Sequence, residues 1–231
     1  MSRGGSERTR EVVYGRRAVL EAERGPRRVH RVLSAKRDGA EELTRVAGSP
    51  DHQGIVAEVD PYAYADPGAL LGSEDALVIA LDEVQDPHNL GAVCRVAEFA
   101  GAAGVVITER RAASVTAAVC KASAGAVEHL AIARVRNLTD WLGLARGQGA
   151  WIYGAAGEAE TRAWDAALTG RVVLVLGGEQ KGLRPRVRSA CDQLISLPRG
   201  GVTDSLNVST AASALCFEAA RQRVAGSRSG S

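Results

Sequence analysis

Short apolar runs that alternate with helical patterns from residue 76 onward are the feature that most limits how this chain can fold. Residues 77–81 (LVIAL) and 172–176 (VVLVL) are apolar at every position, which is typical of strands buried on both faces of a sheet. Strands that alternate with helices in this way form a mostly parallel sheet with helices on both faces. The sequence therefore predicts an α/β fold.

The bounds of these elements follow from the apolar periodicity and from the turn residues between the runs. The predicted strands are residues 77–81, 105–108, 130–135, 151–155, 172–176 and 194–197. The predicted helices are residues 89–101, 114–124 (with Ser114 as N-cap), 138–146, 186–191 and 206–223.

The amino-terminal part has a different order of predicted helices and strands. Its predicted elements are a helix at 11–23, a strand at 28–34, a helix at 38–47 and a strand at 55–59. The prolines and glycines of residues 60–75 are typical of a linker. The resulting organisation is a disordered N-terminus (1–10), a small α/β domain (11–60), a linker (61–75), a large domain (76–224) and a disordered tail (225–231).

Charge is unevenly distributed along the chain. The net charge is +2, but residues 1–37 hold eleven Lys and Arg against four Glu, which gives +7, and the remainder carries −5. A basic amino-terminal part favours a polyanion as partner. A solvated arginine-rich surface fits the charge equally well.

Several classes of protein are disfavoured by composition. No apolar run approaches the roughly 18 residues of a membrane span, and no apolar stretch follows the basic N-terminus as in a signal peptide. The four cysteines are widely spaced without a CxxC pair, which indicates free thiols rather than disulfides or a zinc site. We expect a cytoplasmic protein without membrane or metal partners.

The first polar stretch of interest follows the run at 77–81. Asp86-Pro87 ends the strand, and Asn89 is predicted to cap the next helix. Arg95 lies about 200° around the helix from Val93, so it points away from the apolar stripe. Taken alone, the pattern also fits a capping Asn and a solvated Arg paired with Glu98.

A second polar stretch, residues 177–182 (GGEQKG), directly follows the run at 172–176. It matches neither the P-loop nor the GxGxxG pattern. Paired Gly177 and Gly178 after a strand allow close backbone approach by a ligand, and Glu179 would then face that ligand or a neighbouring chain. An ordinary turn with an exposed Glu is the alternative.

A third polar stretch, residues 198–210, leads into the last helix. Ser205 is a candidate N-cap, and Ser205, Asn207 and Ser209 fall in the first turn of an otherwise apolar helix. Polar groups at a buried helix start need partners, which a ligand or a second subunit would supply.

Together the three stretches resemble the SpoU (TrmH-type) family of RNA ribose 2′-O-methyltransferases, within the SPOUT superfamily. The first motif is DPHNLGAVCRVAEFAGAAGVV, the second LVLGGEQKGL and the third ISLPRGGVTDSLNVSTAASAL. The resemblance covers residues 76–223 closely and 11–60 loosely. The segments GAVEHLAIARV, WIYGAAGEAE and CDQLISLP look most like the branch that methylates a guanosine ribose of bacterial 23S rRNA.

The resemblance implies a fold and a site that the residue pattern alone does not give. The implied fold has a C-terminal trefoil knot, formed around residues 176–207, in which S-adenosylmethionine would sit. The implied cofactor-binding residues are Gly177, Gly178, Leu197 and Leu206. The implied catalytic residues are Asn89, Arg95, Glu179, Ser205 and Asn207. Such enzymes are homodimers with a shared site, and their substrate here would be RNA.

Methyl transfer to a ribose oxygen is an in-line displacement in which positioning supplies much of the rate. A guanidinium is always protonated, so phosphate binding and oxyanion stabilisation suit Arg95 better than a literal role as base. Asn89, Glu179 and Asn207 would hold ribose, loop and Arg95 in register.

Two departures from the family pattern bear on the substrate. Arg199 stands where the family usually has Met, and the amino-terminal domain is shorter than in related enzymes. The alternatives are the same chemistry on tRNA, or a catalytically silent RNA-binding assembly factor. The intact set of Asn89, Arg95, Glu179 and Asn207 disfavours the silent factor.

Overall fold

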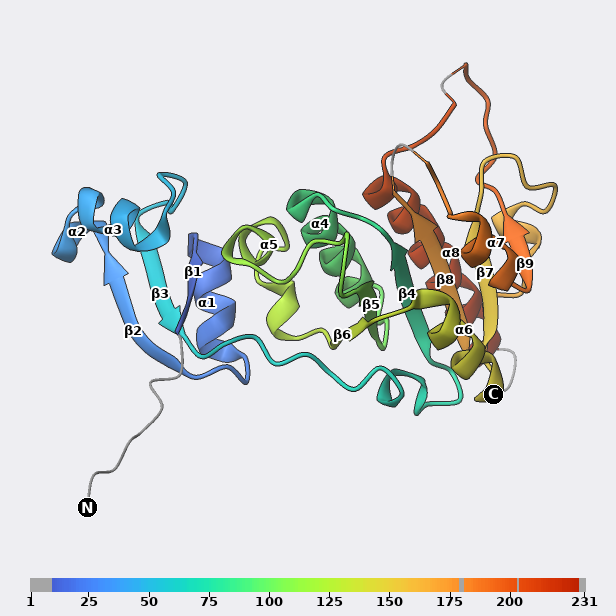
Figure 1. Cartoon of the computed structure of the whole chain (residues 1–231), viewed down its shortest axis with the longest axis horizontal. Coiled ribbons are helices and arrows are strands. Elements are labelled where there is room, and N and C mark those ends of the chain that lie inside the picture. Colours follow the sequence, from blue (N-terminus) through green and yellow to red (C-terminus); the bar gives the residue numbers. More distant parts are fainter. Residues whose placement is uncertain (1–9, 179–180, 203, 229–231) are drawn as a thin grey trace.

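Two sheets make up the computed structural model, which describes residues 10–178, 181–202 and 204–228. A three-stranded sheet has the order β1-β3-β2, and a six-stranded sheet has the order β6-β5-β4-β8-β7-β9. The small sheet lies at one end of an elongated molecule (Figure 1).

The small sheet is antiparallel, with β3 (Ile55–Val59) between β1 (Glu11–Tyr14) and β2 (Val29–Ser34). The prediction of a helix over 11–23 is wrong for its first four residues, because α1 spans only Arg16–Arg24. Val12 and Val13 fit a helix and a strand equally well by local pattern, and pairing with β3 decides the outcome. Gly15, at φ 97°, separates strand from helix.

The other helix of this unit is divided. Gly39, at φ 84°, separates α2 (Ala35–Asp38) from α3 (Ala40–Ala47). The observed helix α3 therefore begins two residues after the predicted start at residue 38. Leu43 of α3 and Leu33 of β2 are fully buried between helices and sheet.

Every described pairing in the large sheet is parallel, as the sequence predicts. Its strands are β4 (Leu77–Asp82), β5 (Gly104–Thr108), β6 (Ile132–Val135), β7 (Trp151–Ala155), β8 (Val172–Gly177) and β9 (Gln193–Ile195). The six predicted strands are thus present, with bounds shifted by at most two residues.

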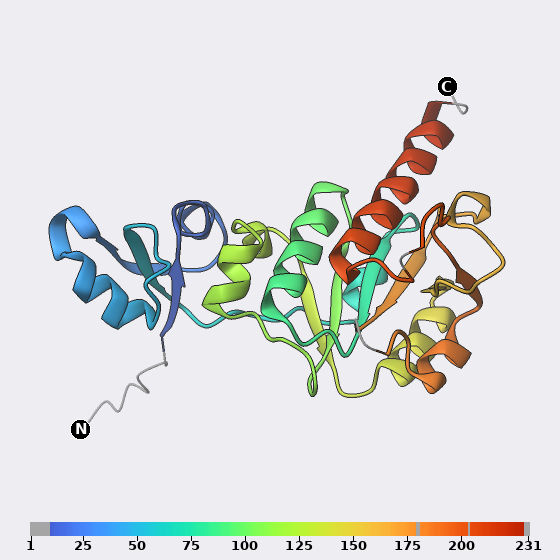
Figure 2. The ribbon, with the colours of Figure 1, turned by 90° about the horizontal axis from the view of Figure 1, so that it is seen from above.

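Alternate residues of β4 pack into cores on opposite faces of the sheet. Ile79 and Leu81 join α4 (Pro87–Phe99), α5 (Ala117–Ala122) and α8 (Val208–Arg228). Val78 and Ala80 join α6 (Leu138–Gly147) and α7 (Pro185–Ala190). Figure 2 shows α4 and α8 side by side over one face, with α6 and α7 on the other. Single 3-10 turns occur at Ala69–Leu71, Ala126–Glu128 and Ala163–Asp165.

Helix α5 begins three residues later than predicted, and Ser114 does not cap it. Thr116 occupies the cap position, and the backbone amide of Val115 donates to the Tyr64 hydroxyl at 2.9 Å. This hydrogen bond holds the preceding segment extended against residues 60–75, which run along the large sheet and pair with it at Ala65.

The small sheet packs against the large unit through a continuous core. Val13 and Val19 belong to the same buried cluster as Val119 of α5. Arg27, with 7% of its side chain exposed, forms an ion pair with Glu128, which has 1% exposed, and reaches Glu11 at 3.2 Å. The two units thus share buried contacts. The division of the chain into two domains, with a linker at 61–75, stays a prediction.

Candidate functional site

Two predicted site residues, Asn89 and Asn207, meet at the carboxyl edge of the large sheet, where α4 and α8 begin. The Asn207 side-chain amide donates to Asn89 Oδ1 at 3.0 Å, across 118 residues of sequence. Asn89 is buried, with 7% of its surface exposed. The structure thus brings together the first and third motif stretches.

Asn89 does not cap α4, contrary to the prediction. Asp86 Oδ1 accepts the hydrogen bond of the His88 amide at 2.8 Å, and Pro87 occupies the first turn. Asp followed by Pro is a favourable helix start, since Pro lacks the amide hydrogen that would otherwise need a partner. Asn89, three residues after Asp86, therefore faces α8 and is not needed as a cap.

Asn207 rather than Ser205 caps α8. Asn207 Oδ1 accepts from the Ser209 amide at 2.8 Å and from the Ser209 hydroxyl at 2.6 Å. The helix begins at Val208, so the predicted start at 206 is two residues early, and it continues to Arg228. The expectation of a buried start is wrong, because Ser205, Leu206 and Asn207 are exposed.

The two glycines after β8 are needed by the chain's own backbone. A Cβ atom on Gly177 would lie 2.0 Å from the carbonyl carbon of Gly182, which no side chain could tolerate. The Gly178 amide donates to the Asp82 carbonyl at 3.0 Å, and the Gly182 amide donates to the Gly178 carbonyl at 2.9 Å. The loop therefore folds back on itself beside β4. Glu179 lies outside the described residues.

The loops after β7 and β9 approach each other at this edge. Leu197 is half-buried just after β9, and Leu206 is 55% exposed. An added Cβ on Gly157 would lie 3.7 Å from the Asp204 carbonyl, so the loop after β7 approaches residues 198–207. Exposed apolar Leu206, half-buried Leu197 and the glycine backbone fit a ligand with apolar parts and hydrogen-bonding groups.

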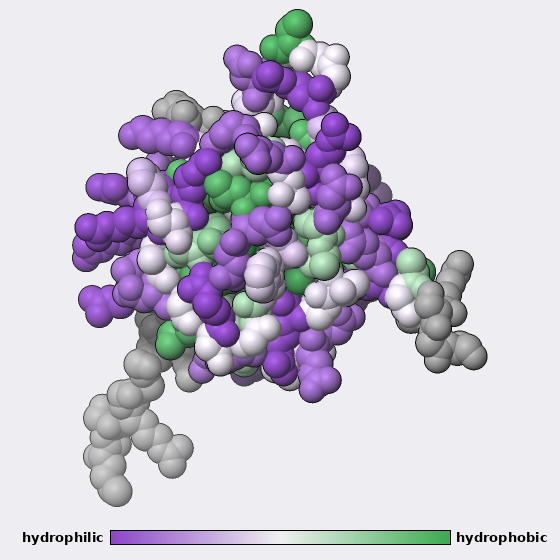
Figure 3. Space-filling view, turned by 90° about the vertical axis from the view of Figure 1, so that its right-hand side faces the viewer, coloured by the Kyte–Doolittle hydropathy of each residue, from purple (hydrophilic) through white to green (hydrophobic). Residues whose placement is uncertain are grey.

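Residues 198–207 project from the body of the molecule (Figure 1). The end view of Figure 3 is mostly hydrophilic, with apolar surface at the tip of this projection. Val202 is 98% exposed, and Arg199 pairs with Asp204 at 3.0 Å. Arg199 thus contacts an acidic side chain of its own loop.

Arg95 is exposed on α4, as predicted, but it is not beside Asn89. The two lie six residues apart, which is about 9 Å along the helix and about 120° around its axis. Within the described ranges the Arg95 guanidinium has no hydrogen-bond or ion-pair partner, so the alternative pairing with Glu98 is not formed. Arg95 shares a helix face with Phe99, four residues on.

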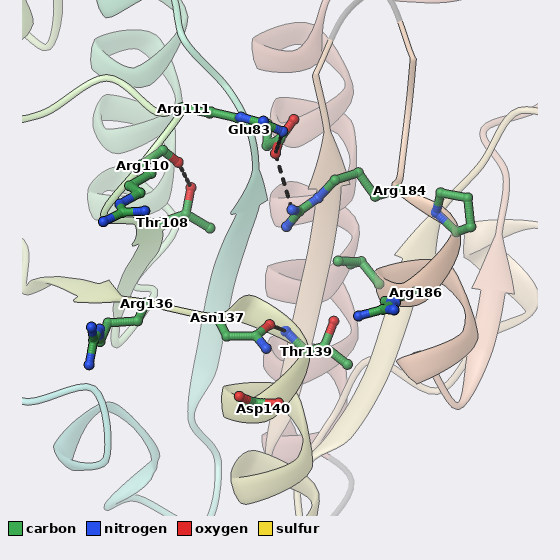
Figure 4. A pocket seen from close by; sticks show the side chains of 12 residues that line it. Glu83, Thr108, Arg110, Arg111, Arg136, Asn137, Thr139, Asp140, Arg184 and Arg186 are labelled. Atoms are coloured by element: carbon green, nitrogen blue, oxygen red, sulfur yellow. Dashed lines mark hydrogen bonds and ion pairs between the residues drawn. The ribbon is translucent and has the colours of Figure 1, made fainter.

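A pocket that the sequence analysis missed opens at the carboxyl ends of β4, β5 and β6, on the α6–α7 face (Figure 4). It has a volume of about 790 Å³, and we call it the basic pocket. Its lining arginines are Arg110, Arg111, Arg136, Arg184 and Arg186. The available signal was arginines just after two predicted strands and at the start of the predicted helix over 186–191, but only the fold brings these segments together.

The cysteines are free thiols, as predicted. Cys94, Cys120 and Cys216 are buried, and Cys191 is half-buried. Burial raises the pKa of the Cys120 thiol to about 11 and that of Cys216 to about 12. Protonated buried thiols are poor nucleophiles. Among the described residues no group of three or more potential metal ligands occurs, and no helix is long and apolar enough to cross a membrane.

Comparison with known proteins gives this geometry a context. Residues 76–217 match the model of the SpoU rRNA Methylase family. The chain belongs to this family. The SpoU match covers all three motif stretches and most of the large sheet, so the predicted family and the predicted class of methyltransferase are confirmed.

Individual SpoU-type relatives match beyond the large sheet. The chain is 41% identical over 195 residues to the 23S rRNA (guanosine-2′-O-)-methyltransferase RlmB of Photobacterium profundum, which covers 83% of this chain and 80% of the relative. It is 37% identical over 241 residues to an uncharacterized tRNA/rRNA methyltransferase of Synechocystis sp.. That match covers 92% of this chain but only 63% of the Synechocystis protein, so the chain spans less than two thirds of its length.

Among solved structures, the SpoU methyltransferase AviRb from Streptomyces viridochromogenes, in complex with AdoMet, is similar over both sheets. The TM-score is 0.78 at 27% sequence identity, covering 93% of this chain and 91% of AviRb. The predicted SPOUT-type α/β fold is therefore confirmed.

Proposed function

We propose that this protein methylates the 2′-oxygen of a guanosine ribose in 23S rRNA, with S-adenosylmethionine as cofactor. Membership of the SpoU family and the similarity to RlmB support the reaction and the substrate. The AdoMet complex of AviRb supports the cofactor. The structural observation that carries the proposal is the Asn89–Asn207 hydrogen bond at the same sheet edge as residues 177–182, which we call the glycine loop.

Gly177, Gly178, Leu197 and Leu206 would hold the cofactor. The glycines present backbone groups without side chains in the way, and the two leucines present apolar surface at the same edge. When bound, S-adenosylmethionine supplies the methyl group on a positively charged sulfur. We further propose that residues 176–207 form the trefoil knot of the superfamily, because the glycine loop closes on itself and residues 198–207 then return to Asn89.

The roles of the catalytic set follow from chemistry and position. A guanidinium suits phosphate binding and stabilisation of negative charge on the attacking ribose oxygen, so these are the roles of Arg95 rather than that of a base. Asn89 and Asn207 fix the edge at which the ribose is held. Ser205, exposed two residues before Asn207, offers a hydroxyl to the substrate. Glu179 is assigned to the same set on the resemblance alone.

A homodimer with a shared site is part of the proposal. Arg95 lies about 9 Å along α4 from Asn89 and about 120° around its axis, so one chain does not complete the set. Phe99 of α4 is 78% exposed and Phe217 of α8 is 49% exposed, with ring centroids 6.0 Å apart. An exposed aromatic pair is typical of an interface. Pairing of two chains through this face would deliver Arg95 of one protomer to residues 198–207 of its partner.

The amino-terminal unit, residues 11–60, is proposed to bind RNA, since most of the excess basic charge lies in and just before it. Residues 61–75 are its linker and residues 76–224 the methyltransferase domain. The segments 1–9 and 229–231 lie outside the described residues. A ribosomal RNA substrate implies a cytoplasmic location.

The test is methyl transfer from labelled S-adenosylmethionine to 23S rRNA isolated from a strain that lacks the modification. We expect label on a guanosine 2′-oxygen, and Arg95→Ala should lower kcat by at least about 100-fold. Transfer to tRNA but not to 23S rRNA would favour the tRNA alternative. RNA binding without any transfer would favour the silent assembly factor, and full activity of Arg95→Ala would overturn the catalytic assignment.

A further inference from the structure

The basic pocket carries more positive charge than its own carboxylates neutralise. Five arginines line it against two acidic residues, Glu83 and Asp140. A cavity of about 790 Å³ is as large as many small-molecule sites, but those are mostly apolar, whereas this lining is strongly charged. Its occupant is therefore anionic.

Two of the arginines are held in the structure by acidic partners. Arg184 Nε donates to Asp82 Oδ1 at 2.7 Å, and Arg184 also pairs with Glu83 at 3.1 Å. Asp82 is buried, so this pair is fixed in place. Arg111 lies 3.6 Å from the same Glu83. Glu83 and Arg111 both adopt φ 57°, which side chains rarely tolerate, so the rim of the pocket is held in a strained conformation.

The other three arginines retain their charge for a ligand. Within the described ranges, the guanidinium groups of Arg110 and Arg186 have no carboxylate partner. Among the described residues Arg136 pairs with Glu109 alone, at 4.0 Å, and its side chain is 88% exposed. Figure 4 shows Arg110 and Arg136 on one side of the opening and Arg186 on the other. Guanidinium groups on two sides suit phosphate, which accepts paired hydrogen bonds.

The start of α6 adds to the positive electrostatic potential of the basic pocket. Asn137 Oδ1 accepts from the Thr139 amide at 3.1 Å, and both residues line the pocket at the positive end of the helix dipole. S-adenosylmethionine does not fit this environment, because its sulfur carries a positive charge. The basic pocket is therefore distinct in chemistry from the proposed cofactor site.

The basic pocket also adjoins the proposed site. A Cβ on Gly178 would lie 3.0 Å from the Glu83 carbonyl, so the rim of the pocket lies directly beside the glycine loop. The phosphate backbone of an RNA strand bound at the proposed cofactor site would reach the pocket along the protein surface. A free nucleotide would use the pocket alone, whereas a strand would use pocket and site together.

We propose that the basic pocket binds backbone phosphates of the RNA strand that flanks the methylated nucleotide, with Arg110, Arg136 and Arg186 as the phosphate ligands. This inference rests on the proposed function for its substrate. It adds a binding subsite on the α6–α7 face, opposite the α4–α8 face that carries Arg95.

The test compares Arg110→Gln/Arg186→Gln with Arg110→Lys/Arg186→Lys in the full chain. Affinity for a 23S rRNA fragment is measured at several salt concentrations, and KM and kcat are measured with the same fragment. The Gln pair should weaken RNA binding at least tenfold, lower the salt slope by about 1.4 (about 0.7 per lost phosphate contact), and raise KM more than it lowers kcat. The Lys pair, which keeps the charge, should keep most of the salt slope.

Calorimetric titration with S-adenosylmethionine and thermal unfolding check that the Gln pair is folded. If the Gln pair binds RNA with unchanged affinity and salt slope, the subsite is overturned. If the wild-type chain binds RNA through these arginines but transfers no methyl group, the subsite stands and the proposed function fails. RNA binding that is insensitive to the Gln pair but displaced by an acidic peptide would assign the pocket to a protein partner and overturn the proposal.

Discussion

Asn207 ties the start of α8 to the start of α4 by donating its side-chain amide to Asn89 Oδ1 at 3.0 Å. The other end of the same amide caps α8 through the Ser209 backbone. One side chain therefore performs two separable tasks, helix capping and positioning of Asn89. Substitutions can remove one task and keep the other.

Asn207→Ser should lower kcat with little loss of stability. Serine is also a good N-cap but is too short to reach Asn89, whereas Asn207→Ala should cost about 1 kcal/mol of unfolding free energy in addition. Urea unfolding and methyl-transfer kinetics of both variants make the comparison. Equal kcat for Asn207→Ser and the wild type would show that the contact with Asn89 does not serve the reaction.

Subunit mixing tests the shared site directly. Arg95→Ala and Asn207→Ser should each be nearly inactive alone. If Arg95 of one protomer serves Asn207 of its partner, a mixed dimer contains one intact site, and equal mixing should restore about a quarter of wild-type activity. Methyl transfer after denaturing and refolding the two chains together is the measurement. No recovery, in mixtures whose mass is that of a dimer, would contradict a site shared between protomers.

The buried Arg27–Glu128 pair should matter far more than a surface pair. Arg27→Met leaves Glu128 buried without a partner, which should cost about 3–5 kcal/mol of unfolding free energy. Arg27→Met/Glu128→Leu should recover part of that loss. Arg24→Met is the matched control, since Arg24 is 60% exposed in its pair with Glu21 and should cost less than about 1 kcal/mol. A cost for Arg27→Met no larger than for Arg24→Met would contradict the assignment.

Stability should fall at alkaline pH through the buried thiols. Burial raises the pKa of Cys216 to about 12 in the folded chain, whereas the unfolded thiol titrates near 8.5. The unfolded state then loses the proton first, so the unfolding free energy falls as pH rises above the unfolded pKa, by up to about 1.4 kcal/mol per pH unit.

Cys216→Ala isolates this contribution. Urea unfolding of wild type and variant between pH 7 and 10, under reducing conditions, gives two pH slopes. The variant should lose stability more slowly above pH 8.5, although its stability at pH 7 is lower because a buried sulfur is removed. Parallel slopes would mean that the Cys216 thiol titrates alike in both states.

The large sheet was predictable from local pattern because its strands are apolar on both faces. Residues 77–82 and 172–177 can bury every side chain only inside a parallel sheet. Residues 11–14 were not predictable in this way, since their valines fit helix and strand alike and only pairing with β3 decides. Long-range pairing overrides local preference at such positions.

The candidate site likewise has features that local sequence predicts and features that only the fold reveals. The motif positions of Asn89, Gly177 and Asn207 could be found from sequence, but the residues that cap α4 and α8 were predicted wrongly. The local capping rule predicts Asn89 as the cap of α4, whereas Asp86 occupies that position. The rule does not reveal the contact of Asn89 with Asn207, 118 residues away. The basic pocket escaped notice because its arginines come from separate segments that only the fold unites.

The way the small sheet is joined to the large one has a consequence for target choice. A flexible tether would let an RNA-binding unit search a wide volume, and the methylation site would then accept any nucleotide in reach. Here the buried Arg27–Glu128 pair and the common core fix the separation between the small sheet and the carboxyl edge of the large sheet. If the small sheet binds RNA as proposed, this fixed separation selects the methylated nucleotide by its distance along a folded RNA.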